Sequence, residues 1–128
     1  MPQSDDTITV VTVDDQAPFR AAARALVANT PGFELVGEST DGAGALHLVR
    51  DADPDMVILD VRMPGIDGID VAAQLRSEDP SRIVVLVSSS EVRELAPLAR
   101  ACGAAALLRK QWMTPRMLRG LWVAHRRR

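Results

Sequence analysis

The sequence predicts an α/β fold with one parallel five-stranded sheet covered by helices on both faces, and three observations lead to this prediction. Five short apolar runs alternate with five segments of helical periodicity. The connections between them are short, and no internal repeat is present. With 128 residues, the chain is long enough for one domain core and too short for two ordinary ones.

The first strand and helix have clear limits. Ile8–Val13 is an apolar, β-branched run, as in a strand that is buried on both faces. Pro18 can begin the helix that follows, and an apolar face recurs at helical spacing over residues 19–27. Pro31 and Gly32 are expected to end this helix.

The second and third strands are predicted at Phe33–Gly37 and Met56–Leu59. A polar cluster at 39–42 can cap the second helix, and the Met-Pro-Gly run at 63–65 suits a tight turn, with glycine where a positive φ is needed. The helices after these strands are marked by apolar or small residues at helical spacing: Leu46 and Val49, then Gly68, Val71, Ala72 and Leu75.

The last two units differ in how their helices begin. Ile83–Val87 is the most apolar strand, and a helix is expected within Glu91–Ala101. Pro97 lies inside that segment and cannot donate a backbone hydrogen bond, so this fourth helix should start late or be distorted. Ala104–Leu108 is the fifth predicted strand, and a Thr-Pro pair at 114–115 can cap and open the last helix.

Polar side chains stand directly after four of these strands. In a parallel sheet the carboxyl ends of the strands meet at one edge, where ligands bind. The residues that this places together are Asp14, Asp15, Asp60, Ser88 and Lys110. Lys110 is the single lysine among fifteen basic residues, as expected for a site that needs a compact point charge instead of a planar guanidinium.

Three neighbouring carboxylates repel one another and either bind protons or recruit a cation. Their oxygens suit Mg²⁺, with Mn²⁺ as an alternative. A carboxylate in such a site can attack a phosphoryl group as a nucleophile, while an ammonium group and a hydroxyl stabilise the charge on the phosphoryl oxygens. Asp60, Lys110 and Ser88 are the candidates for these roles.

Four stretches of the sequence resemble the signature stretches of response-regulator receiver domains, the CheY-like superfamily. They are VDDQAPFR at 13–20, ILDVRMPGIDG at 58–68, LVSS at 86–89 and ACGAAALLRK at 101–110. The resemblance extends from about Ile8 to His125 and is greatest to NarL/FixJ-type two-component regulators. It implies a (βα)5 domain with the flavodoxin-like strand order 2-1-3-4-5.

The resemblance also implies a function: a receiver accepts a phosphoryl group from a histidine kinase or a phosphotransfer protein in a Mg²⁺-dependent reaction. The face formed by the fourth helix, fifth strand and last helix then changes and controls dimerisation or an output domain. The roles carried over are Asp60 as phosphoacceptor, Asp15 and more peripherally Asp14 as metal carboxylates, Arg62 as a backbone carbonyl ligand, Ser88 as the hydroxyl switch and Lys110 as the phosphoryl contact.

Three positions depart from the family pattern. Leu107 stands where an aromatic residue usually couples to the hydroxyl switch. Gln111 follows Lys110 where many receivers have proline, so a cis peptide is not expected there. Trp112 offers a substitute aromatic reporter, although burial against the last helix is the plainer expectation.

The expected organisation is a flexible segment at 1–7, a receiver domain at 8–126 and a tail at 127–128 that can begin a linker. Expected partners are the kinase or phosphotransfer protein and a second copy of the chain, with DNA bound only through an output domain outside this sequence. With one cysteine, no signal peptide and no membrane-length apolar run, a cytoplasmic protein that binds no membrane is expected. The basic stretch 109–128 is expected to be a solvated helix face.

Other functions remain open at this stage. A Mg²⁺-dependent phosphohydrolase would share the aspartyl nucleophile, but Arg62 stands where such an enzyme needs an acid. A flavodoxin-like cofactor binder would need a phosphate loop after the first strand, and the sequence has none there. A stand-alone or phosphorylation-independent receiver acting through protein contacts is the remaining alternative, and Leu107 and Pro97 are compatible with it.

Overall fold

The fold was analysed in a computed structural model that describes residues 7–63, 65–89 and 93–126. The described residues form one parallel five-stranded sheet with the order β2-β1-β3-β4-β5, as the sequence predicted. The strands are β1 Ile8–Val13, β2 Phe33–Ser39, β3 Met56–Asp60, β4 Ile83–Ser88 and β5 Ala106–Arg109. The expectations for residues 1–6 and 127–128, for Pro64 and for residues 91–92 concern positions outside the described ranges.

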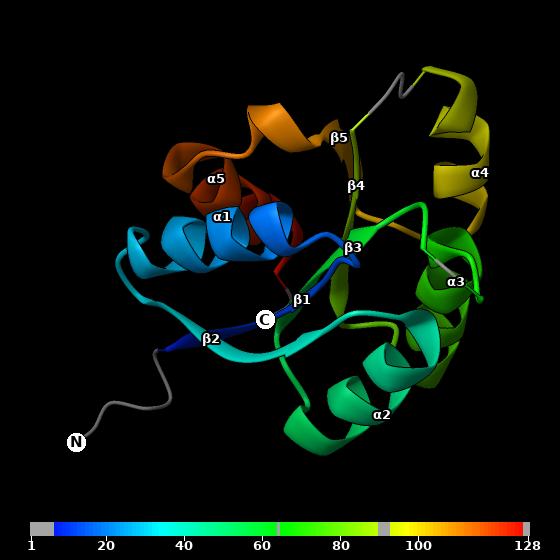
Figure 1. Ribbon diagram of the computed structural model, residues 1–128, viewed down its shortest axis with the longest axis horizontal. Helices are drawn as coiled ribbons and strands as arrows, with labels where there is room; N and C mark the ends of the chain where they lie inside the picture. The colour runs from blue at the N-terminus through cyan, green and yellow to red at the C-terminus, as the bar shows by residue number, and fades with distance from the viewer. Residues whose placement is uncertain (1–6, 64, 90–92, 127–128) are drawn as a thin grey trace.

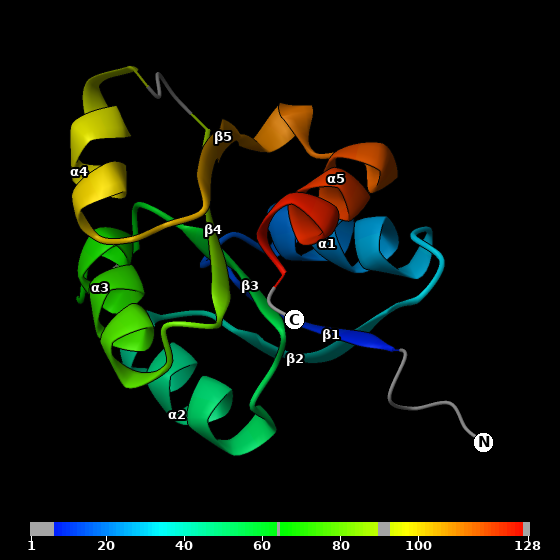
Figure 2. The same cartoon turned by 180° about the vertical axis from the view of Figure 1, so that it is seen from behind.

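Helices cover both faces of this sheet (Figure 1). They are α1 Ala17–Ala28, α2 Gly42–Ala52, α3 Gly68–Glu78, α4 Ala96–Ala101 and α5 Pro115–His125, with short 3₁₀ turns η2 Arg93–Leu95 and η3 Lys110–Trp112. α1 and α5 lie on one face, and α2, α3 and α4 lie on the other, which is also evident from behind (Figure 2). None of the helices in the described ranges has the length and apolar character that crossing a bilayer demands.

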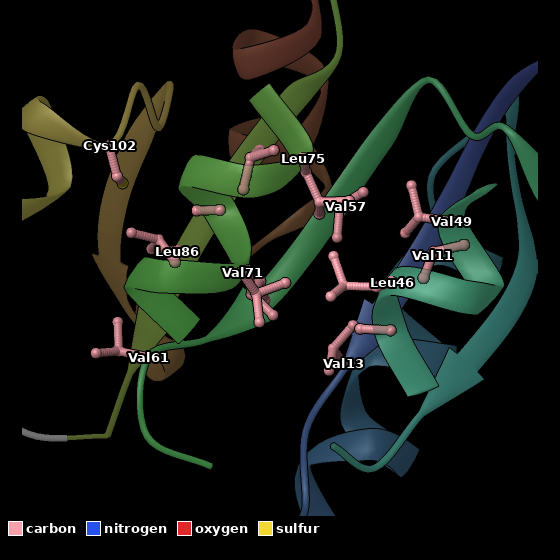
Figure 3. Packing of buried hydrophobic residues seen from close by; sticks show 14 of the residues in the cluster. Val11, Val13, Leu46, Val49, Val57, Val61, Val71, Leu75, Leu86 and Cys102 are labelled. Carbon is pink, nitrogen blue, oxygen red and sulfur yellow. The ribbon is translucent and has the colours of Figure 1, made fainter. Parts of the chain in front are cut away.

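Two apolar cores result from this layering, because successive side chains of a strand point to opposite faces. Val10 packs toward α1 and α5, whereas its neighbour Val11 packs toward α2, α3 and α4. Figure 3 shows the second core, in which Val11 and Val57 of the sheet meet Leu46 of α2 and Val71 of α3. The three central strands are therefore buried on both sides, which explains why their sequences are uninterrupted apolar runs.

Two strands, β2 and β5, differ from the sequence prediction by two residues at one end. β2 extends two residues past Gly37, because a register shift opposite Val10 and Val11 lets the ladder continue to Ser39. β5 begins at Ala106 instead of Ala104, since the chain is still leaving the turn at Gly103. α4 starts late, as expected: its regular turns begin at Ala96, which places Pro97 in the first turn where its missing N–H is tolerated.

Strand register determines which side chains meet at the carboxyl edge of the sheet. Leu59 of β3 is paired with Val13 of β1 and with Leu86 of β4. Ser88 of β4 is paired with Arg109 of β5. The residues that end β1, β3, β4 and β5, and the residues that directly follow them, therefore lie side by side at this edge.

Candidate functional site

Three carboxylates cluster at the carboxyl edge of the sheet. Asp14 and Asp60 are buried, with 7% and 5% of their surfaces exposed, and Asp15 is exposed. One carboxylate oxygen of each lies within 4.8 Å of one oxygen of the others. Asp14, to which the family resemblance gives the more peripheral metal role, is the more enclosed of the neighbouring pair Asp14 and Asp15.

Lys110 inserts its ammonium group between the two buried carboxylates. Its Nζ lies 2.7 Å from Asp14 Oδ2 and 3.3 Å from Asp60 Oδ2. The same Nζ lies 3.7 Å from the centroid of the Phe19 ring. Only 6% of the Lys110 side chain is exposed, so these contacts form with little water to weaken them.

Backbone amides hold the carboxylates in place. The N–H of Arg62 donates to Asp60 Oδ1 at 3.1 Å, and the N–H of Gln16 donates to Asp14 Oδ1 at 2.9 Å. The Arg20 guanidinium donates to the main-chain carbonyl of Asp14 at 3.0 Å. Each buried carboxylate thus accepts one backbone hydrogen bond and contacts one ammonium group.

The pKa of the Asp60 carboxyl is raised above its ordinary value of 3.8. Burial is the largest cause, since it disfavours the charged form, and the negative charge of Asp14 acts in the same direction. The hydrogen bond from the Arg62 amide and the charge of Lys110 lower the pKa but do not cancel the effect of burial.

The donor set suits a hard divalent cation. The cluster contains three carboxylates, and the Lys110 ammonium group contacts two of them, so an excess of negative charge remains when all three are ionised. Carboxylate and carbonyl oxygens are the ligands that Mg²⁺ takes in proteins. The residues present therefore fit such an ion.

Ser88 and the glycines of the β3–α3 connection complete the edge. Ser88 is buried at the last position of β4, one residue after the Val87 that pairs with Asp60. Gly65 adopts a φ of +80°, as the turn prediction required. Gly68 lies so close to β3 that a Cβ on it would overlap the main-chain carbonyl of Asp60.

An apolar cavity of about 80 Å³ lies beside these groups, between α1 and the sheet. Asp14 and Lys110 line it together with Phe19 from the first turn of α1. Further along, its walls are Ala22, Ala23 and Leu26 of α1 and Met113 after η3. The ammonium group of Lys110 therefore stands at a boundary between carboxylates and apolar side chains.

The structure brings together all the positions that the strand ends predicted, and it adds two that were not predicted. The Phe19 ring was expected only as part of an apolar helix face, and the Arg62 amide was not considered as a donor to Asp60. The available signal for the Phe19 contact was its place directly after Pro18, as the first large side chain of the helix.

The structure shows the surroundings of the three positions that depart from the receiver pattern. Leu107 packs against the core beneath α2, α3 and α4. The peptide after Lys110 is trans. The expected burial of Trp112 is wrong: 47% of this residue is exposed, because η3 turns its ring outward to lie 6.0 Å from the Arg109 guanidinium carbon.

Comparison with known proteins agrees with this geometry. The sequence model of the response regulator receiver domain matches residues 10–121. Among solved structures, the NarL signal receiver domain from Mycobacterium tuberculosis is similar with a TM-score of 0.81 and 33% identity, over 91% of this chain and 97% of that chain.

Curated relatives are longer proteins. The chain is 37% identical over 105 residues to the probable transcriptional regulatory protein NarL of Mycobacterium tuberculosis, covering 82% of this chain and 49% of the relative. It is 40% identical over 104 residues to a protein-glutamate methylesterase/protein-glutamine glutaminase of Myxococcus xanthus, covering 80% of this chain and 30% of that enzyme. The chain thus spans about half the length of these relatives or less.

Proposed function

Because this chain belongs to the response regulator receiver domain family, we propose that it is a phosphorylation switch of a two-component system in which Asp60 accepts the phosphoryl group. The observation that carries the proposal is the environment of the Asp60 carboxylate. It is held by the Arg62 amide and lies 3.3 Å from Lys110, beside a second buried carboxylate, Asp14.

The proposed reaction transfers a phosphoryl group from a phosphohistidine of a sensor kinase or phosphotransfer protein. A carboxylate oxygen of Asp60 forms a bond to phosphorus, the bond between phosphorus and the histidine nitrogen breaks, and the imidazole leaves and takes up a proton. Lys110 contacts the transferred group with its positive charge, and the Ser88 hydroxyl donates a hydrogen bond to it. The product is an aspartyl phosphate.

Asp14, Asp15 and Asp60, with the main-chain carbonyl of Arg62, are proposed to hold Mg²⁺, and Mn²⁺ is the alternative ion. When bound, the ion supplies positive charge against the oxygens of the transferred phosphoryl group. The excess of negative charge in the cluster supports this assignment, because three carboxylates lie close together and Lys110 contacts two of them.

We place this chain among signalling proteins and not among enzymes that turn over a separate substrate. Arg62 occupies the position two residues after Asp60 where an aspartyl phosphohydrolase needs an acid. The similarity to a methylesterase covers 30% of that enzyme and carries no esterase activity to this chain. We propose a cytoplasmic protein, because its donor is a kinase or phosphotransfer protein of the same compartment.

The α4-β5-α5 face is the proposed output surface. β5 is an edge strand, so the change at Lys110 and Ser88 can reach this face directly. Its partner is proposed to be a second copy of the chain or an output domain that binds DNA. The relative that is named as a transcriptional regulatory protein is about twice as long as the match, which supports an output domain outside this sequence.

Intact mass after incubation with acetyl phosphate tests the proposal. We expect one added phosphoryl unit with Mg²⁺, none with a chelator, and none in the Asp60→Asn variant. Asp70→Asn is the matched control, because it removes an exposed carboxylate from α3. Absence of the added mass in the unaltered chain under every condition would overturn the proposal in favour of a receiver that acts without phosphorylation.

A further inference from the structure

We propose that Phe19 is a positioning residue for the phosphoryl transfer, with the face of its ring holding the ammonium group of Lys110 beside Asp60. This inference rests on the proposed function of Asp60. It assigns a role to a residue of α1, which is not one of the sheet-edge residues given a part in the transfer above.

The contact between the two side chains is direct and enclosed. Lys110 Nζ lies 3.7 Å from the centroid of the Phe19 ring, well inside the distance at which a cation is attracted to an aromatic face. Because 6% of the Lys110 side chain is exposed, the attraction acts in a desolvated place, where it is strongest. Phe19 is fixed by its position in the first turn of α1, where its N–H donates to the carbonyl of Gln16 at 3.1 Å.

The Phe19 ring can replace part of the hydration that the Lys110 ammonium group loses on burial and that the carboxylates do not replace. An ammonium group is strongly hydrated and has three N–H donors, and its carboxylate contacts are Asp14 at 2.7 Å and Asp60 at 3.3 Å. Lys110 also lines the apolar cavity, whose α1 wall beyond Phe19 consists of alanines and a leucine. Among the side chains that α1 contributes to this cavity, the Phe19 ring is the one whose negative face can take the place of lost water.

The ring also differs from the carboxylates in what competes for it. A divalent cation attracted to Asp14 would compete with the ammonium group for the oxygen that now lies 2.7 Å from Nζ. The ring is neutral, so a divalent cation competes with the ammonium group for the ring much more weakly than for Asp14. Phe19 therefore keeps Lys110 near Asp60 when Asp14 is engaged elsewhere, and the charge needed in the transition state is in place beforehand.

The single lysine of the chain makes the contact measurable without phosphorylation. In metal-free protein labelled with ¹³C-lysine, one ε-methylene signal is expected, and it should be displaced upfield by the ring. Phe19→Leu keeps an apolar side chain but removes the aromatic face, so the displacement should vanish. Phe19→Tyr keeps the face and should retain it. Leu26→Val is the matched control, because Leu26 lines the same cavity from the same helix.

The same variants are then phosphorylated with acetyl phosphate at saturating Mg²⁺. Phe19→Leu is expected to lower the maximal rate about fivefold, within the range of a desolvated cation–π contact, with a less than twofold change in the donor concentration at half-maximal rate. Phe19→Tyr and Leu26→Val should stay within twofold of the unaltered chain. Folding of each variant is checked by circular dichroism and thermal unfolding.

Two results would overturn the inference. One is an unchanged lysine signal and rate in Phe19→Leu. The other is an equal loss of rate in folded Phe19→Tyr, since that would indicate packing instead of the aromatic face. If the unaltered chain accepts no phosphoryl group, the proposed function fails, and the lysine signal alone then supports or contradicts the contact.

Discussion

At the scale of single residues, the Asp60 carboxylate destabilises the metal-free protein at neutral pH. Its pKa is raised, first by burial and then by the charge of Asp14, so the folded state binds a proton more tightly than the unfolded state does. The contribution of Asp60 to stability is therefore greatest below the ordinary carboxyl pKa of 3.8 and falls as the pH rises through the raised value.

Asp60→Asn is expected to raise the free energy of unfolding at pH 7 by about 1 kcal/mol in the presence of a chelator, because the amide carries no charge to desolvate. The gain should shrink as the pH is lowered toward 4. Urea unfolding at several pH values measures both effects. The exposed control Asp70→Asn should change stability by less than about 0.5 kcal/mol. A less stable Asp60→Asn protein at pH 7 would contradict this account of the site.

Residue types at strand ends were enough to predict which side chains meet at the site, because parallel strands bring their carboxyl ends to one edge. Asp60, Ser88 and Lys110 were found in this way. The Phe19 contact was not predictable, since it depends on the angle at which α1 leaves the sheet. The exposed Trp112 was missed for a similar reason: the 3₁₀ turn that rotates its ring has no pattern of its own in the sequence.

At the scale of elements, burial decided how well each one could be predicted. β1, β3 and β4 are enclosed on both faces, and their apolar runs match the observed strands to within one residue. β2 and β5 are the edge strands and are partly exposed, so pairing and turn geometry set their ends instead of hydrophobicity. The late start of α4 was predictable because a single residue, Pro97, imposes it.

The β3–α3 connection gives a prediction at this scale. A Cβ at Gly68 would overlap the Asp60 carbonyl and lie 2.8 Å from Val61 Cα, and both are backbone atoms that cannot turn aside. Gly68→Ala should therefore destabilise the protein by about 1–3 kcal/mol, despite the better helix propensity of alanine. It should also slow phosphorylation, because Asp60 must move to make room.

The matched control is Gly120→Ala in α5, where a Cβ meets nothing within 4 Å. That change should stabilise the protein by about 0.5–1 kcal/mol through helix propensity alone. Thermal unfolding of both variants checks the contrast. Equal effects of the two substitutions would show that the close approach of α3 to β3 is not the limiting feature.

At the scale of the whole molecule, the fold separates the parts that hold it together from the part that reacts. The two apolar cores lie above and below the sheet, whereas the carboxylates and Lys110 lie at one edge. The free energy gained by packing the two cores can therefore compensate for the free-energy cost of burying charge at the site. A ligand that relieves the unfavourable charge at the edge should stabilise the entire domain, since the edge is formed by the ends of its central strands.

Magnesium is that ligand if the proposed function is correct. At ten times its dissociation constant, the linkage relation gives about 1.4 kcal/mol, on the order of 5 °C in the midpoint of thermal unfolding for a domain of this size. NaCl at equal ionic strength is the control and should have a smaller effect.

Because Mg²⁺ and Asp60→Asn both remove the same excess charge, their stabilising effects should be clearly less than additive when combined. Full additivity would mean that the ion binds away from Asp60, and no midpoint difference between the two salts would mean that the edge does not bind it.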